Sequence, residues 1–206
     1  ILNEFDPYRQ VVSRLKGLQK TGHRTDKIEM IISGGTFNFY PKAYQRNFVK
    51  GVYNGLNYDY GDGKKERSLD EAQRKNEKAN NRCVGLSIET RPDYIDEESL
   101  KFFRKLGVTK VELGVQCLDD NIYKLNKRGH GVKEVQESLK LLKDAGFKIN
   151  VHFMPNMYGS NKKKDLEMFS ELFDNELYKP DWLKIYPCVV VPYSPLEKIY
   201  RDGGHK

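Results

Sequence analysis

The sequence predicts an α/β domain built on a sheet of parallel strands. Five short apolar stretches are each followed by residues with helical spacing, and several of the stretches are apolar throughout instead of alternating with polar residues. Continuous apolar character is typical of strands that helices cover on both faces, as in parallel sheets. We expect the sheet to curl into a barrel, although an open doubly wound sheet has the same periodicity.

Predicted helices and strands alternate along the whole chain. The first helix begins at Asp6-Pro7, a capping residue before a proline, and carries apolar residues at helical spacing as far as Gly22. Residues 57–67 have no period and predict a mobile surface loop. The predicted strands are 28–32, 83–88, 108–115, 148–153 and 182–186, and the later predicted helices are 41–56, 68–79, 96–106, a pair across 119–146, and one around 166–173.

Length and composition restrict the class of protein. The 206 residues suit one domain, and 36 Lys and Arg against 29 Asp and Glu give a net charge of +7, which favours partners that carry phosphate. The apolar runs are too short to span a bilayer and the first residues do not resemble a signal peptide, so we expect a cytoplasmic protein without membrane contact. Cys83, Cys117 and Cys188 lie far apart in apolar stretches, which predicts buried small side chains and no disulfide or metal site.

Polar residues follow several of the predicted strands, where parallel α/β folds bind their ligands. A Gly34-Gly35 pair lets a ligand approach the backbone and Thr36 adds a hydroxyl, but a plain turn uses the same residues. Glu89 and Arg91 can bind ribose hydroxyls and a carboxylate, or form an ion pair with each other at the rim.

The later strands carry three further candidates. The amide of Gln116 can bind a nucleoside, or it can be buried and satisfied by the backbone. His152 shares a strand face with Asn150 and is either a base or a core histidine. Lys184 shares a face with Tyr186, and it either reaches an acidic or phosphate ligand or lies on the helix side of the sheet. We predict that His152 and Lys184 are the catalytic residues.

Six short phrases are spread over nearly the whole chain: GHRTDKIE (22–29), SGGTF (33–37), IETRPD (88–93), ELGVQ (112–116), NKRGH (126–130) and LKIYP (183–187). In this order they resemble the family of the Elongator catalytic subunit, a radical S-adenosylmethionine (SAM) enzyme that modifies wobble uridine in tRNA. Gly-Gly-Thr alone would fit many radical SAM enzymes, whereas the spaced combination is specific.

The resemblance implies that residues 1–206 form a partial (β/α)₆ radical SAM barrel. It implies SAM, a [4Fe–4S] cluster whose cysteine ligands lie upstream of this chain, acetyl-CoA as carbon donor, and an acetyltransferase-like domain downstream, so this stretch alone is expected to be inactive. Its implied partners are tRNA and either further Elongator subunits or a second copy. The implied cofactor residues are Gly34, Gly35 and Thr36 for the methionine part of SAM, Glu89, Arg91 and Gln116 for its nucleoside, and Lys27 for acetyl-CoA.

Basic residues near the barrel rim are the predicted tRNA contacts. For the lysine run that begins at Lys162, a solvated surface is the alternative. Two other functions are compatible with such a barrel: a radical SAM enzyme acting on a small molecule and a silent tRNA-binding module, with a non-redox barrel enzyme as the most general alternative. The predicted RNA-binding residues are Lys64, Lys65, Arg67, Arg128, Lys162, Lys163 and Lys164.

Overall fold

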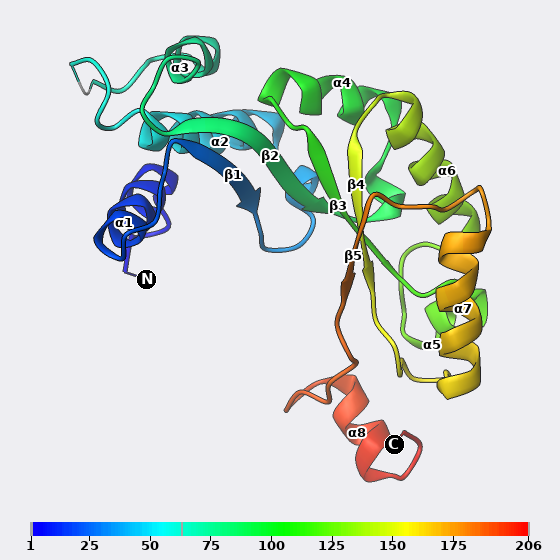
Figure 1. The fold of residues 1–206 in the computed structure, drawn as a ribbon. Coiled ribbons are helices and arrows are strands. Elements are labelled where there is room, and N and C mark those ends of the chain that lie inside the picture. Colours follow the sequence, from blue (N-terminus) through cyan, green and yellow to red (C-terminus); the bar gives the residue numbers. More distant parts are fainter. Residues whose placement is uncertain (1, 63, 206) are drawn as a thin grey trace. The chain divides into compact units, whose positions relative to one another are not determined.

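A computed structural model describes residues 2–62 and 64–205, and it has the α/β alternation that the sequence predicts (Figure 1). The chain divides into two compact units, one of Ile1–Glu89 with Glu98–Lys110 and the other of Thr90–Glu97 with Val111–Lys206. The strand order in the sheet follows the chain, β1-β2-β3-β4-β5. Parallel pairing of β1 with β2 and of β4 with β5 confirms the parallel α/β class.

In the first unit, helix α1 packs closely against α2. The carboxylate of Asp6 accepts the amide of Arg9 and Pro7 occupies the first turn, so α1 begins where the sequence predicts. A Cβ on Gly55 would lie 2.7 Å from the Cβ of Val11, so the close approach of the two helices requires glycine there. The elements of this unit are α1 (Pro7–Lys20), β1 (Lys27–Ile32), the 3₁₀ turn η1 (Phe37–Phe39), α2 (Lys42–Leu56), α3 (Leu69–Asn76), β2 (Arg82–Thr90) and α4 (Glu97–Leu106).

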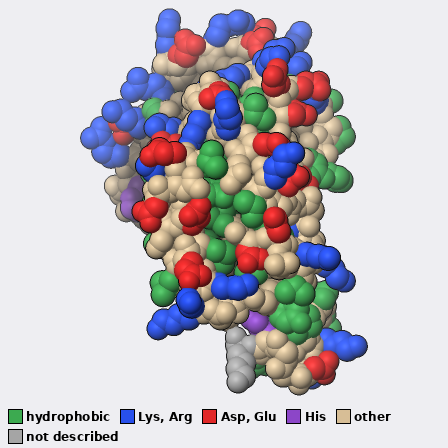
Figure 2. Space-filling view, turned by 90° about the vertical axis from the view of Figure 1, so that its right-hand side faces the viewer, with side chains coloured by type: hydrophobic (Ala, Val, Ile, Leu, Met, Phe, Trp, Pro, Cys, Tyr) green, Lys and Arg blue, Asp and Glu red, His purple; other side chains and the backbone are tan. Residues whose placement is uncertain are grey.

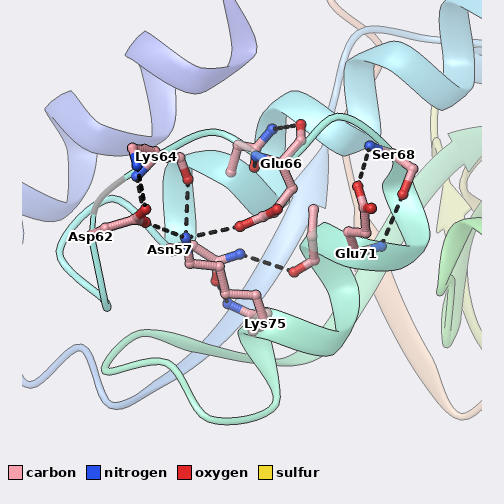
Figure 3. A network of polar contacts seen from close by, with 10 residues as sticks. Asn57, Asp62, Lys64, Glu66, Ser68, Glu71 and Lys75 are labelled. Carbon is pink, nitrogen blue, oxygen red and sulfur yellow. Dashed lines mark hydrogen bonds and ion pairs between the residues drawn. The ribbon is translucent and has the colours of Figure 1, made fainter.

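The segment 57–67 is irregular, as predicted, but polar contacts tie it to α3 (Figure 3). The ammonium of Lys75 donates to the carboxylate of Glu66 at 2.9 Å and to the carbonyl of Lys64 at 3.0 Å. Asn57 is buried and its amide donates to the carbonyl of Ala72 at 2.9 Å. Residue 63 lies outside the described residues. The rest of the segment is therefore held by charge-assisted and buried hydrogen bonds.

In the second unit, strand alternation separates an apolar face from a polar one. Along β3 the apolar Val111 and Leu113 alternate with Glu112, and along β4 the apolar Val151 separates Asn150 from His152. The apolar members are fully buried. The elements are η2 (Pro92–Tyr94), β3 (Lys110–Gln116), α5 (Asp120–Leu125), α6 (Val132–Asp144), β4 (Lys148–Phe153), α7 (Lys162–Asp174), β5 (Trp182–Ile185) and α8 (Pro195–Arg201).

Some local expectations need adjustment. β3 begins at Lys110 and not at residue 108, because the amides of Gly107 and Val108 still bond back to the carbonyls of Arg104 and Phe103 at the end of α4. Cys117 is buried as predicted, whereas Cys83 and Cys188 are only half-buried. Across the described ranges, no helix is long and apolar enough to cross a membrane.

Candidate active site

The carboxylate of Glu112 is fully buried and contacts three polar side chains from two other strands. Its Oε2 accepts from Nδ2 of Asn150 at 3.0 Å and lies 3.0 Å from Nε2 of His152 and 2.7 Å from Nζ of Lys184. His152 and Lys184 are register partners in the β4–β5 ladder, so both side chains reach the same oxygen. The two predicted catalytic residues therefore lie together, and Lys184 reaches an acidic group of the protein itself.

The electrostatics of this cluster depend on the balance between burial and pairing. Burial alone would raise the pKa of Glu112, but the contacts of His152 and Lys184 outweigh it and lower the pKa of the carboxyl to about 2. Glu112 is thus an anion at neutral pH and keeps a positive charge on Lys184 close to it. An ammonium, an imidazole and a carboxylate in contact can hold a proton or bind an anionic oxygen.

The cluster retains unused hydrogen-bonding capacity. Among the residues that the structure describes, no group bonds to Oε1 of Glu112 or to Oδ1 of Asn150, although both atoms are buried. The ring of Tyr186 lies edge-on to His152, with centroids 5.4 Å apart, and is partly exposed. Unsatisfied buried acceptors are uncommon and are typical of functional sites.

The Gly34-Gly35 turn after β1 encloses a second carboxylate, in the first unit. Glu89 accepts the amides of Gly34 and Gly35 through one oxygen, at 2.8 and 3.0 Å, and the hydroxyl of Ser33 through the other at 2.9 Å. Both glycines have positive φ, 136° and 101°, and a Cβ on either would meet nothing within 4 Å. The space beside the Cα atoms of this turn is accordingly open to a ligand. Thr36 follows directly as the N-cap of η1.

Arg91 and Gln116 lie in the second unit. Arg91 forms a bidentate pair with Asp93, at 2.9 and 2.6 Å. Gln116 ends β3 with φ of 76°, rare for a residue other than glycine, and its buried Oε1 has no described partner. Backbone strain of this kind is often found at functional sites.

Arg128 and His130 adjoin this region. The half-buried Arg128 donates to the carbonyl of Gly114 at 3.3 Å. His130 is buried, with its Nδ1 3.4 Å from Asp93, and burial together with the charge of Arg128 lowers its pKa. Neither ring nitrogen has a hydrogen-bond partner in the described structure. Sequence reasoning missed both His130 and Asp93 as site residues.

Lys27 lies at the amino end of β1, whereas Gly34 follows its carboxyl end. Six residues of strand at roughly 3.3 Å each place the two sites about 20 Å apart. Lys27 is exposed and borders a cavity of about 530 Å³ that Arg82 and Arg104 also line. With three cations against one carboxylate, that of Glu77, the lining of this cavity suits a ligand that carries phosphate.

The other predicted RNA-binding residues are on the surface, and several face acidic partners. Lys64 pairs with Asp62 at 3.2 Å, and Lys164 lies 3.4 Å from Asp119. The ammonium of Lys65 lies 3.8 Å from the ring centroid of Tyr8. Figure 2 shows basic and acidic side chains interspersed on the face that it presents. Arg67, Lys162 and Lys163 are exposed.

The cysteines are unsuited to hold an iron–sulfur cluster. Burial raises the pKa of Cys117 to about 11 and also raises those of Cys83 and Cys188, so the thiol form is favoured over the thiolate that binds metal. Across residues 2–62 and 64–205, no three His, Cys, Asp or Glu side chains group closely enough to bind a metal ion.

Comparison with known proteins identifies the family. The model of the radical SAM superfamily matches residues 3–172. The chain belongs to the radical SAM superfamily. It is 45% identical over all 206 residues to the tRNA uridine(34) acetyltransferase of Methanocaldococcus infernus, and 38% identical over 202 residues to Elongator complex protein 3 of Danio rerio, with 98% of this chain aligned. It spans 38% and 36% of the lengths of these relatives.

A solved structure supports the same relationship. The Elp3 of M. infernus with an N-terminal deletion superposes with a TM-score of 0.93 at 46% identity, over 98% of this chain and 46% of that one. The parallel α/β barrel fold and the resemblance to the Elongator catalytic subunit family are thereby confirmed. Membership of the radical SAM superfamily implies SAM and a [4Fe–4S] cluster. The open Gly34-Gly35 turn fits a ligand such as SAM, whereas the described residues offer no set of cluster ligands.

Glu112 is the main site residue that sequence reasoning did not single out. A carboxylate in the middle of the apolar stretch Val111–Val115 must be paired when it is buried, and that signal was present in the sequence. What the sequence did not contain was the identity of the partners. They come from β4 and β5, and the sheet register selects them.

Proposed function

We propose that this chain is the SAM-binding barrel of a longer enzyme that uses acetyl-CoA to modify C5 of uridine 34 in tRNA. The observation that carries the proposal is 45% identity along the whole chain to a protein named tRNA uridine(34) acetyltransferase. The buried cluster of Glu112, His152 and Lys184 supports an enzyme in preference to a silent RNA-binding barrel, because such a cluster is costly unless function requires it.

In this proposal SAM, when bound, supplies the radical chemistry. The residues of the chain position it: Gly34, Gly35 and Thr36 contact its methionine part. Glu89, Arg91 and Gln116 bind its nucleoside. The open Cα positions of the two glycines and the strained Gln116 are what support this assignment.

Lys184 and His152 act on the substrate. The ammonium of Lys184, 2.7 Å from Oε2 of Glu112, donates to a carbonyl oxygen where negative charge develops. His152, positioned by the same carboxylate, holds or returns a proton. Lys27, with Arg82 and Arg104, binds the phosphates of acetyl-CoA.

Transfer RNA is the proposed macromolecular substrate, and the basic surface residues bind its phosphates. These are Lys64, Lys65, Arg67, Arg128, Lys162, Lys163 and Lys164. Further subunits are proposed partners, which the name Elongator complex protein 3 of several relatives supports. A second copy as partner and a cytoplasmic location remain predictions. Reversing the charge of any of these basic residues should lower the affinity for tRNA. It should also reduce the salt dependence of that affinity by about one charge per residue.

The enzyme is tested in its full-length form, reconstituted under anaerobic conditions. The wild type should form 5′-deoxyadenosine and modify uridine 34, as measured by mass spectrometry of tRNA. Lys184→Met should lower product formation at least about 100-fold, and the exposed Lys133→Met is the matched control. Gly35→Val should weaken SAM binding at least about tenfold in calorimetric titration while the protein stays folded. Wild-type activity in Lys184→Met, or undisturbed SAM binding in Gly35→Val, would remove these residues from the site.

A further inference from the structure

A row of five aromatic side chains extends from the core to solvent beside the Gly34-Gly35 turn. Successive ring centroids lie 4.9 Å apart for Tyr40 and Tyr44, 6.0 Å for Tyr44 and Phe48, and 5.8 Å for Phe48 and Phe37. Phe39 adjoins Tyr40 at 6.3 Å. We call these residues the aromatic row.

The aromatic row has a fixed inner end and an exposed outer end. Phe37 is buried and Phe48 half-buried, whereas Phe39 is 69% exposed and Tyr40 and Tyr44 are each 47% exposed. A contiguous exposed patch of aromatic rings is typical of an interaction site. The inner rings are packed, so the outer ones are held in place before any ligand arrives.

A cavity of about 130 Å³ lies between the aromatic row and the glycine turn. Its lining residues include Gly34, Gly35, Tyr40 and Tyr44. An engineered apolar cavity of roughly 150 Å³ binds benzene, so this one is of the size of a single planar ring. A nucleobase offers such a ring and stacks on tyrosine with about 1–3 kcal/mol.

The charges around the aromatic row favour a polyanion. No Asp or Glu occurs between Glu29 and Asp59, and helix α2 carries Lys42, Arg46 and Lys50 at intervals of four. At about 100° per residue these cations form a row on one side of the exposed face of α2. Lys42 pairs with Glu98, and the guanidinium of Arg46 lies over the ring of Phe102, 5.9 Å from its centroid.

The exposed face of α2 therefore has an aromatic edge and a basic edge. Tyr40 and Tyr44 form the first, and Arg46 lies on the second. Between them are the exposed, small Ala43 and Asn47, which leave room for a chain to cross the helix. Proteins that bind single-stranded nucleic acid combine aromatic rings, on which bases stack, with nearby cations that contact the backbone.

We propose that the aromatic row binds an unpaired nucleobase of RNA by stacking on Tyr40 and Tyr44, with the adjoining phosphate near Arg46. The inference rests on the proposed tRNA substrate and deepens it: the base is one next to the modified nucleotide in an open loop, and not one in a duplex. Three cations on α2 and the absence of Asp and Glu from residues 30–58 favour this polyanionic occupant over an apolar protein surface.

The test uses the full-length protein and two RNA probes. One is a hairpin with a seven-nucleotide loop that carries 2-aminopurine beside the uridine, and the other is a duplex of the same stem without unpaired bases. The double variant Tyr40→Ala/Tyr44→Ala should weaken hairpin binding about tenfold or more and abolish quenching of the 2-aminopurine. Binding of the duplex should stay within twofold.

Three control variants separate stacking from other effects. Tyr40→Phe/Tyr44→Phe keeps the rings and should bind the hairpin within twofold of wild type. Arg46→Gln should lower the salt dependence by about one charge. Tyr200→Ala, at a 52% exposed tyrosine elsewhere, should change nothing. Thermal melting verifies that each variant is folded.

The outcomes that overturn the proposal are specific. Hairpin affinity within twofold of wild type in the double alanine variant, or equal weakening for hairpin and duplex, would show that no base stacks there. Altered subunit assembly in sedimentation with unchanged RNA affinity would assign the aromatic row to a protein partner. Failure of the proposed function is a different result, namely wild-type protein that leaves tRNA unmodified while the 2-aminopurine is still quenched.

Discussion

Each of the two units holds a carboxylate among its strands, Glu112 in one and Glu89 in the other, and the two differ in the groups that contact them. Glu112 is completely buried, forms an ion pair with an ammonium and contacts the ring of a histidine. Glu89 is half-buried and accepts two backbone amides and a hydroxyl from the glycine turn. The contacts of Glu112 bring titratable side chains to one oxygen, whereas those of Glu89 bring backbone amides that fix the glycine turn.

The largest effect should come from removing the charge of Glu112. Glu112→Gln leaves the ammonium of Lys184 partly buried without its counter-ion, so we expect the free energy of unfolding to fall by about 3 kcal/mol or more. Urea denaturation at pH 7 measures it. The double variant Glu112→Gln/Lys184→Met should recover part of the loss, since it removes both charges. A loss below about 1 kcal/mol would mean that the pair contributes little and the contrast with Glu89 is unfounded.

The stability of the protein at acid pH should depend on the same carboxylate, that of Glu112. The pKa of Glu112 is lowered from 4.5 to about 2 in the folded state. Its contribution to the free energy of unfolding is therefore complete above the unfolded pKa and disappears as the pH falls toward 2. The shift corresponds to on the order of 3 kcal/mol between pH 7 and pH 2. Stability of the wild type and of Glu112→Gln should therefore converge over this window in denaturant titrations. Parallel curves would contradict the pairing.

A smaller effect is expected at Glu89. Glu89→Gln keeps an acceptor oxygen but weakens the charge-assisted bonds from Gly34 and Gly35, for a loss of about 1–2 kcal/mol. The glycine amides should also exchange their hydrogens faster with solvent, which NMR can follow. If Glu89→Gln destabilises the chain as strongly as Glu112→Gln, backbone dipoles and a cationic partner are equivalent here and the comparison fails.

The smallest effect concerns the conformation of the glycine turn. Gly35→Ala meets no steric obstacle, so its cost is that of φ at 101° for an L-residue, about 1–2 kcal/mol. Gly17→Ala is the matched control, because Gly17 lies inside α1 with open space around it and alanine there should stabilise by up to about 1 kcal/mol. A lower melting temperature for Gly35→Ala and a higher one for Gly17→Ala would support the requirement for glycine at residue 35. Changes of the same sign in both variants would refute it.

Local sequence determined the helices, the strands and the polar residues at the strand ends. Asp6-Pro7 began α1 and Ser68 with Glu71 capped α3, because capping and hydrophobic periodicity are properties of neighbouring residues. Local sequence also indicated that Lys184 needs an anionic partner. It did not indicate which residue provides the anion.

Only the tertiary structure decided which residues meet. Glu112 reaches His152 and Lys184 because β4 and β5 are in one register, and a shift by a single residue would turn these side chains to the other face. Lys27 is separated from Gly34 by the length of β1, and the exposed Tyr40 and Tyr44 stand beside the glycine turn. Such juxtapositions depend on pairing between distant segments, which local propensity and periodicity do not encode.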